Sequence, residues 1–205
     1  MHLVFNSVGD GDFRLLREDS GTGLYRGAAP SIAGGPLLLL TPLTETPTPA
    51  TLQRLSNELA LQECLDEAWA AKPIGLRRIG GVTTLLLKDP GGDLLEGLLG
   101  APMDLRRLLA MAIGIAGALR RAHLNGLVHR NLQPANILVT EDGASVHLTG
   151  FGIASSTPRA KGASASQPLE GTLAYMAPEQ SGRLDLAVDA RSDLYSLGIV
   201  LFQMA

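Results

Sequence analysis

The sequence is poor in the residues that mark secreted, membrane or disordered proteins. It has a single cysteine, Cys64, so no disulfide can form within the chain, which fits a reducing compartment. Charged residues make up 18% and hydrophobic residues 45%, which is typical of a globular chain. The formal net charge is −3 and no basic stripe is visible, so there is no electrostatic reason to expect a nucleic-acid partner.

Aromatic residues and long apolar runs are also scarce. Aromatics are 4% of the chain, so Leu, Ile, Val and Ala must fill the core. The longest nearly continuous apolar stretch, Leu108 to Leu119, is too short to span a bilayer, so no membrane insertion is expected. The N-terminus lacks the pattern of a signal peptide, and a cytoplasmic location is the resulting prediction.

The chain is long enough for one domain or two small lobes. In its first part, Leu37 to Leu40 and Val82 to Leu87 are short apolar runs that predict buried strands. A helix is expected from about Leu52 to Ala70, with Thr51 as its N-cap. The sequence DPGG, Asp89 to Gly92, then predicts a turn or hinge.

The second part begins with a clear helical pattern from Leu105 to Leu119, which Asn125-Gly126 should stop. Asn136 to Val139 and Ser145 to Leu148 are predicted to form a tight hairpin. The segment from Asp193 to Met204 is predicted to be helical. Between hairpin and last helix lies a Ser/Ala/Gly-rich stretch that predicts a polar loop whose serines are candidates for phosphorylation.

Four motifs follow one another in the order of the protein kinases. HRNLQPANILV (His129 to Val139) resembles the catalytic loop, H-R-D-L-K-P-x-N, and LTGFGIAS (Leu148 to Ser155) resembles the D-F-G region. GTLAYMAPEQ (Gly171 to Gln180) resembles the end of the activation segment. SDLYSLGIVLF (Ser192 to Phe202) is similar to the start of the long central helix of the C-lobe.

This resemblance implies an α+β, two-lobed protein-kinase-like fold. Residues 1–88 would form a β-rich N-lobe with one helix, and residues 89–205 a mostly helical, partial C-lobe, truncated after the start of its central helix. The run from Glu58 to Arg78 and the sequence LLLKDPGG add a narrower likeness to the kinase-like N-terminal domains of bacterial multidomain hybrid sensor histidine kinases. That likeness implies protein partners in a signalling assembly, and Gly150 would be a feature of the group.

The resemblance assigns the chemistry to positions whose residue types differ here. Asn131 stands where the family has its Asp base, and an amide cannot accept the substrate hydroxyl's proton at neutral pH. Gln133 stands where a Lys would face the transferring phosphate. Asn136 matches the family's metal ligand, but Gly150 occupies the position of the D-F-G Asp, which makes Mg²⁺ binding doubtful. Thr149 could offer only a hydroxyl.

In the N-lobe, the family pairs a strand Lys with a helix Glu. The Lys position falls on Leu40 or, with a slip of one residue, on Thr41, and Glu58 matches the Glu. The glycines of EDSGTG, Glu18 to Gly23, do not fit G-x-G-x-x-G, so an ordinary hairpin turn is favoured there. The predicted nucleotide contacts are therefore the backbone groups from Leu87 to Asp89 and Gly152 of the F-G pair.

Other matches are structural. His129 and Phe151 resemble the family's stacked pair, and Asp193 resembles the Asp that accepts backbone N–H bonds from the catalytic loop. A simple N-cap at Ser192 or Asp193 is the alternative. In the family Glu179 pairs with an Arg far downstream, which would lie beyond Ala205.

The leading functional prediction is a pseudokinase signalling module with at most weak ATP binding. The alternatives are an active Ser/Thr protein kinase that transfers the γ-phosphate of ATP with atypical groups, and a non-functional fragment.

Overall fold

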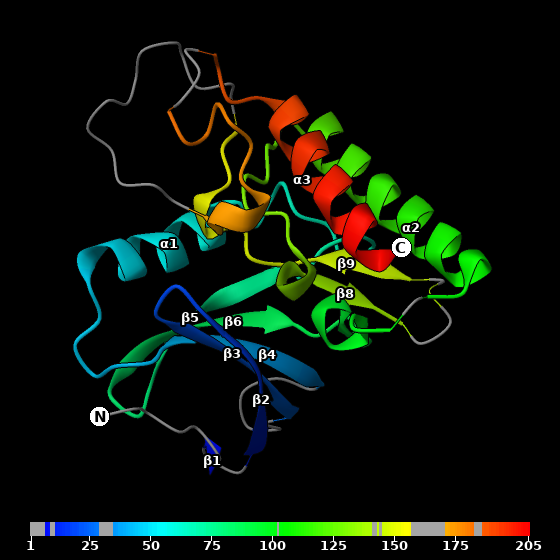
Figure 1. The fold of residues 1–205 in the computed structure, drawn as a ribbon. Helices are drawn as coiled ribbons and strands as arrows, with labels where there is room; N and C mark the ends of the chain where they lie inside the picture. The colour runs from blue at the N-terminus through cyan, green and yellow to red at the C-terminus, as the bar shows by residue number, and fades with distance from the viewer. Residues whose placement is uncertain are drawn as a thin grey trace. The chain divides into compact units, whose positions relative to one another are not determined.

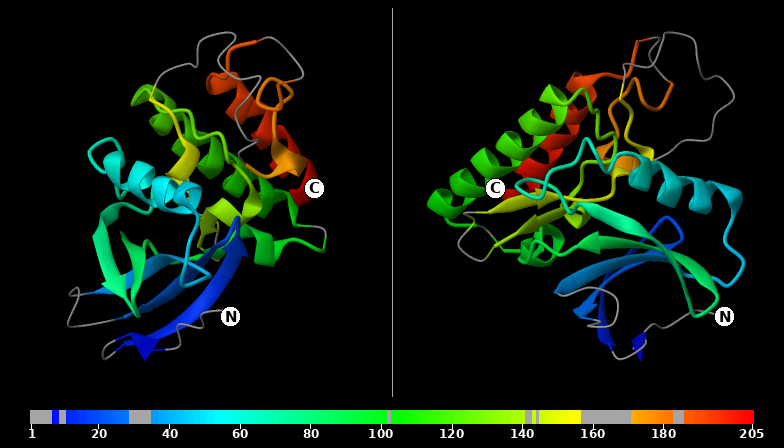
Figure 2. Two further views of the ribbon diagram at one scale, coloured as in Figure 1. Left: turned by 90° about the vertical axis from the view of Figure 1, so that its left-hand side faces the viewer. Right: turned by 180° about the vertical axis from the view of Figure 1, so that it is seen from behind.

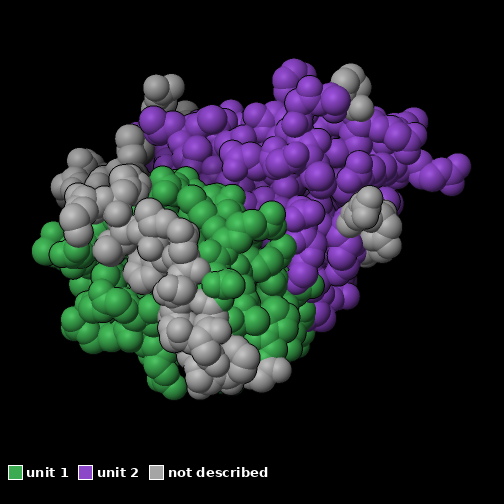
Figure 3. All heavy atoms as spheres, turned by 90° about the horizontal axis from the view of Figure 1, so that it is seen from below, with its two compact units in different colours: residues 1–67, 71–90 green, residues 68–70, 91–205 purple. Residues whose placement is uncertain are grey.

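The computed structural model describes residues 7–8, 11–28, 35–101, 103–140, 143, 145–156, 171–182 and 186–205. The chain divides into two compact units, shown in different colours in Figure 3. Unit 1 comprises Met1–Glu67 and Ala71–Pro90, and unit 2 comprises Ala68–Ala70 and Gly91–Ala205. Strands dominate unit 1 and helices unit 2 (Figure 1), which confirms the predicted α+β class.

Within the described part of unit 1, six strands form one antiparallel sheet in the order β1-β2-β3-β4-β6-β5. The twist of this sheet is visible in both views of Figure 2. Its strands are β1 (Ser7–Val8), β2 (Gly11–Asp19), β3 (Thr22–Ala28), β4 (Pro36–Pro42), β5 (Pro73–Ile79) and β6 (Val82–Lys88). The two buried strands expected from apolar runs are therefore β4 and β6.

The centre of the sheet is β4, whose residues from Leu37 to Thr41 are all buried. Successive side chains of a strand point to opposite faces, so an unbroken buried run requires cover on both faces. Leu37 and Leu39 belong to a core cluster on one face with Phe13, Tyr25 and Leu86. Leu38 and Leu40 lie on the other face.

The segment EDSGTG contains a hairpin turn, as expected. Asp19 pairs with Thr22, which leaves Ser20 and Gly21 as a two-residue loop between β2 and β3. Both have positive φ, 50° and 79°, the combination of a type I′ turn.

The helix α1 (Pro49–Ala60) is shorter than predicted and begins earlier. Its N-cap is Thr48, not Thr51, because the Thr48 side chain accepts a hydrogen bond from the Thr51 N–H at 3.2 Å. The helix ends at Ala60 with Leu61 as its C-cap. It does not extend to Ala70 as predicted, since Ala70 pairs with Leu148 and the Trp69 carbonyl accepts the Leu148 N–H at 2.8 Å. Helical propensity carries no signal of that pairing.

In unit 2, the described residues form a three-stranded antiparallel sheet in the order β7-β8-β9. Its strands are β7 (Asp93–Leu94), β8 (Ile137–Val139) and β9 (Val146–Leu148), and β8 and β9 form the predicted hairpin. Short 3₁₀ helices lie at Leu95–Leu98, Pro134–Asn136, Phe151–Ile153 and Leu173–Tyr175.

The helix α2 (Leu105–Leu124) starts at the N-cap Asp104 and ends before Gly126, whose φ of 73° confirms the predicted stop. It packs on β9 and α3, but Leu105 and Leu109 of the predicted stripe are exposed. The buried face consists of Met111, Ile115, Ala118, Leu119 and Ala122. The helix is apolar on more than one side, so its spacing alone does not identify the buried face.

The helix α3 (Ala190–Met204) begins three residues earlier than predicted, with Asp189 as its N-cap. The Asp189 carboxylate accepts from the Arg191 N–H at 2.8 Å, and bonding to Arg191 also lowers the pKa of Asp189. Ser192 and Asp193, the caps considered from the sequence, lie inside the helix and are buried. Among the described helices, none combines the length and hydropathy needed to cross a membrane.

Candidate functional site

The segment that resembles a catalytic loop is held by the carboxylate of Asp193. One oxygen accepts the His129 N–H at 2.8 Å and the other accepts the Arg130 N–H at 2.7 Å. Asp193 is fully buried, so these charge-assisted bonds are formed out of water. The role that the family resemblance implied for Asp193 is confirmed.

His129 connects this loop to the residues before Phe151. Its Nδ1 accepts the Asn131 N–H at 3.2 Å, so its Nε2 carries the proton and donates to the Thr149 carbonyl at 3.1 Å. The ring lies against Phe151 with centroids 4.5 Å apart, as the resemblance predicted. Burial lowers the pKa of His129, which agrees with a neutral ring whose two nitrogens are both used.

A second connection runs from Arg130 to the segment before α3. Arg130 has a φ of 66°, and its guanidinium donates to the Ile153 carbonyl at 2.9 Å. The Gln180 amide donates to the Arg130 carbonyl at 2.8 Å and accepts the Ala177 N–H at 3.2 Å. Gln180 was not singled out from the sequence, since an exposed-looking Gln after A-P-E carries no pattern of its own.

The two degenerate catalytic positions lie in the loop that Asp193 holds. The Asn131 carbonyl accepts a hydrogen bond from the Asn136 side chain at 2.8 Å. The Asn131 Oδ1 is buried and has no hydrogen-bond partner among the described residues. Gln133 is buried and extended, and its carbonyl accepts the Asn136 N–H at 2.9 Å. Both side chains are neutral, so neither supplies the charge that the family has at its position.

Gly150 and Asn136, the two metal positions, are in direct contact. Gly150 has a φ of 81°. A Cβ atom built there would lie 2.7 Å from Cγ and Oδ1 of Asn136 and 2.9 Å from its Nδ2. Contacts this short are not found in real structures, so the Asn136 amide fills the space that a side chain at position 150 would need.

The oxygen donors beside Gly150 are neutral. Asn136 Oδ1 and Thr149 Oγ1 are buried and have no hydrogen-bond partner in the described part of the chain. The described residues also contain no group of three His, Cys, Asp or Glu side chains able to hold a metal. Mg²⁺ prefers carboxylate and phosphate oxygens, so these residues do not fit the ion that the family uses.

In unit 1, the strand and helix positions both fall on buried residues. Leu40 on β4 is 7% exposed, and the neighbouring Thr41 is fully buried with its hydroxyl 2.8 Å from that of Thr84. Glu58 on α1 is also fully buried. Neither Leu40 nor Thr41 can supply a cation in this sheet.

The residues predicted to contact nucleotide at the end of β6 form hydrogen bonds and an ion pair with other residues of unit 1. The Asp89 carboxylate, 4% exposed, pairs with the Arg26 guanidinium at 2.7 and 3.0 Å. The backbone N–H groups of Lys88 and Asp89 donate to the carbonyls of Lys72 and Pro36. Leu87 is buried in β6. In unit 2, Gly152 is buried in the 3₁₀ helix after Gly150.

Glu179 of the A-P-E motif accepts a hydrogen bond from Ser192 at 2.6 Å. The sequence predicted only the loss of its usual Arg partner, and the serine contact was missed because it depends on the docking of α3. The Ser196 hydroxyl donates to the Tyr175 carbonyl at 2.7 Å in the same region. The predicted phosphorylation loop, 157–170, lies outside the described residues.

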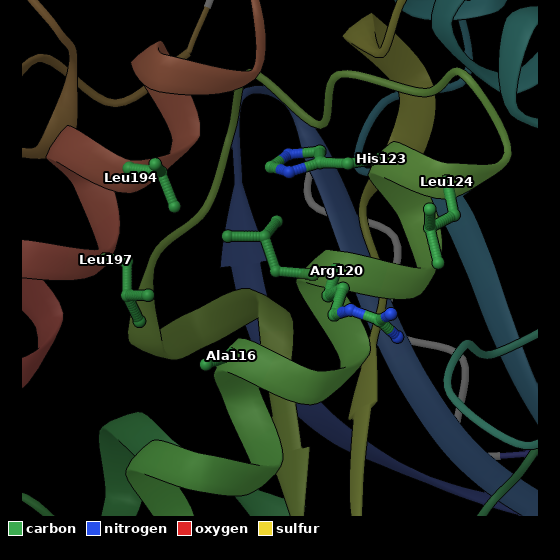
Figure 4. A pocket seen from close by; sticks show the side chains of 7 residues that line it. Ala116, Arg120, His123, Leu124, Leu194 and Leu197 are labelled. Atoms are coloured by element: carbon green, nitrogen blue, oxygen red, sulfur yellow. The ribbon is translucent and has the colours of Figure 1, made fainter.

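A small groove of about 260 Å³ lies between α2 and α3 (Figure 4). It is lined by Ala116, Leu119, Arg120, His123, Leu124, Leu194 and Leu197. The His123 ring extends from α2 toward α3, and its Nε2 lies 2.8 Å from the Asp193 carboxylate. His123, near the end of α2, therefore contacts the same carboxylate as the catalytic-loop backbone.

The protein kinase domain family matches residues 87–205, more than half of the chain. The chain therefore belongs to the protein kinase domain family.

Curated relatives are serine/threonine kinases of bacteria. A "Probable serine/threonine-protein kinase" of Clostridium acetobutylicum is 35% identical over 128 residues, covering 62% of this chain and 19% of that protein. The DNA damage-responsive serine/threonine-protein kinase RqkA of Deinococcus radiodurans is 41% identical over 105 residues, which cover 51% of this chain and 15% of RqkA. Serine/threonine-protein kinase PknL of Mycobacterium tuberculosis is 39% identical over 115 residues, which cover 56% of this chain and 28% of PknL. The chain thus spans well under a third of each relative's length.

Proposed function

We propose that this chain is a protein kinase module of the serine/threonine type, which binds ATP and transfers its γ-phosphate slowly to a protein hydroxyl. The observation that carries the proposal is the catalytic-loop backbone, held by two hydrogen bonds to the buried Asp193. The names of the bacterial relatives support the choice of Ser and Thr as acceptors.

In this reaction the acceptor oxygen forms a bond to the γ-phosphorus while the bond to the β–γ bridging oxygen breaks and ADP leaves. The Asn131 amide can orient the acceptor hydroxyl but cannot take its proton, which must pass to the phosphate or to water. A missing positioned base lowers the rate by about 10²–10⁴. We therefore expect slow turnover.

A second candidate is a signalling module that acts through contacts alone. It is favoured by one specific observation: the base, phosphate-facing and metal positions carry the neutral residues Asn131, Gln133 and Gly150. Protein partners, a bacterial sensor assembly and a cytoplasmic location are proposals that rest on the sequence resemblance and composition.

A labelling experiment separates the two candidates. The purified chain is incubated with ATP carrying a radioactive γ-phosphate and a generic Ser/Thr-rich protein acceptor. We expect label above a heat-denatured control, and its loss in Asn136→Ala, with circular dichroism confirming that the variant is folded.

Two other results are informative. Absence of label together with an ATP-dependent rise in melting temperature would replace the catalytic proposal with the non-catalytic one. Absence of both would remove nucleotide-dependent function altogether.

A further inference from the structure

We propose that nucleotide binding by this chain does not depend on Mg²⁺, because Gly150 supplies no side chain to hold the ion and the buried oxygens beside it are neutral. The inference rests on the proposed function only in requiring that a nucleotide binds. It differs from the usual behaviour of the family, in which Mg²⁺ bridges the phosphates to an Asp and an Asn.

The first argument is steric. A side chain at position 150 would overlap the Asn136 amide, with a Cβ only 2.7 Å from its Cγ. Asn136 is not easily displaced, since its Nδ2 donates to the Asn131 carbonyl at 2.8 Å. Its backbone is fixed as well, because its N–H bonds to Gln133 and its carbonyl to the Thr149 N–H at 3.0 Å. The Asn136 amide therefore lies directly against Gly150, and position 150 contributes no ligand of its own.

The second argument is electrostatic. Asn136 Oδ1 and Thr149 Oγ1 are the buried oxygens beside this position that have no hydrogen-bond partner among the described residues, and both are neutral. Mg²⁺ gives up its water reluctantly and is held in proteins through carboxylates. Neutral oxygens of this kind are better satisfied by water, which costs far less to bring into a buried polar site.

The direct test is calorimetric titration of the full chain with ATP, once in MgCl₂ and once in EDTA. We expect the two Kd values to agree within about twofold, which corresponds to a negligible free-energy difference. ATP binding that tightens by more than about tenfold in MgCl₂ would overturn the inference.

A matched pair of variants locates the effect at position 150. Gly150→Ala adds the clashing Cβ without charge, whereas Gly150→Asp adds the same Cβ and a carboxylate. We expect both to lower the melting temperature to a similar degree, because both displace Asn136. Only Gly150→Asp should acquire tighter ATP binding in MgCl₂ than in EDTA. If MgCl₂ tightened ATP binding by Gly150→Ala as much as by Gly150→Asp, the role assigned to Gly150 would be contradicted.

If Gly150→Asp does not fold, Asn136→Ala provides the second variant. It opens the steric space without adding charge, so its ATP binding should stay indifferent to Mg²⁺. Failure of the inference and failure of the proposed function give different results. Binding that requires Mg²⁺ defeats the inference alone, and absence of ATP binding in both buffers defeats the proposed function and the inference with it.

Discussion

At the scale of single residues, the Asp193 carboxylate accepts hydrogen bonds from the backbone of His129 and Arg130 and contacts the His123 ring. These groups lie more than sixty positions away in the sequence. Asp193 therefore fixes the loop through tertiary contacts, and its importance does not depend on whether phosphate is transferred.

Replacing Asp193 should be severely destabilising. Asp193→Ala leaves the buried His129 N–H and the half-buried Arg130 N–H without an acceptor, each costing about 1–3 kcal/mol. We expect a total loss above about 3 kcal/mol and a smaller loss for Asp193→Asn, which keeps one acceptor oxygen. Urea unfolding measures both, with the exposed Asp12→Ala as control. A loss in Asp193→Ala no larger than that of the control would contradict this account.

His129 should make stability depend on pH. Burial lowers its pKa from the ordinary value of 6.5, so the folded protein keeps the ring neutral. Below pH 6.5 the unfolded chain takes up a proton that the folded chain does not, and stability falls as pH falls. The slope is at most about 1.4 kcal/mol per pH unit.

The free energy of unfolding of the natural chain and of His129→Gln is measured from pH 7.5 downward, at intervals of roughly one pH unit. The variant is expected to be less stable throughout but to lack the His129 part of the slope. Since His123 and His147 remain in both proteins, identical slopes would show that His129 does not titrate differently on folding.

At the scale of elements, the turn before β7 contains two glycines with different requirements. Gly91 and Gly92 both have positive φ, 80° and 73°. Beside Gly91 a Cβ would meet nothing within 4 Å, whereas beside Gly92 it would collide with the Val139 carbonyl of β8. Gly92 is thus required by packing and Gly91 only by backbone conformation.

The two glycines therefore form a matched pair. Gly91→Ala should cost about 1–2 kcal/mol, the usual penalty of a left-handed conformation. Gly92→Ala should cost clearly more, because the backbone of β7 and β8 must also separate. Thermal and urea unfolding of both variants test this, and equal losses would show that the close approach to Val139 relaxes without cost.

At the scale of the whole molecule, the missing charges are distributed over both units. Leu40 lies in unit 1, while Asn131, Gln133 and Gly150 lie in unit 2. Catalytic groups that act as a unit give strongly non-additive effects. Restoring one charge therefore leaves the other three positions neutral.

Restoring the family's residues should show this non-additivity. We expect Asn131→Asp, Gln133→Lys, Gly150→Asp and Leu40→Lys to raise phosphate transfer little one at a time. Combined, they should exceed the best single variant by at least roughly tenfold, as a base alone is worth 10²–10⁴ when the rest of the machinery is present. Adding Asn136→Ala to the combination is the control. A full gain from Asn131→Asp alone would refute the argument.

Much of the fold could be predicted because its signals are local. The buried runs of β4 and β6, the turn at Ser20-Gly21 and the β8–β9 hairpin depend on neighbouring residues only. The extended conformation of Ala70 and the burial of Ser192 could not be predicted, since both involve partners distant in sequence. Ser192, for example, bonds to Glu179 and leaves the cap to Asp189.

The sequence alone determined which chemical groups stand at each family position, because residue identity is independent of folding: Asn131, Gln133 and Gly150 are neutral in any conformation. Only the tertiary structure decided what surrounds them. It brought the Asp193 carboxylate into contact with the catalytic-loop backbone, buried Glu58 and placed the Asn136 amide against Gly150. Such contacts arise when distant segments pack together, and no pattern along the chain encodes their distances.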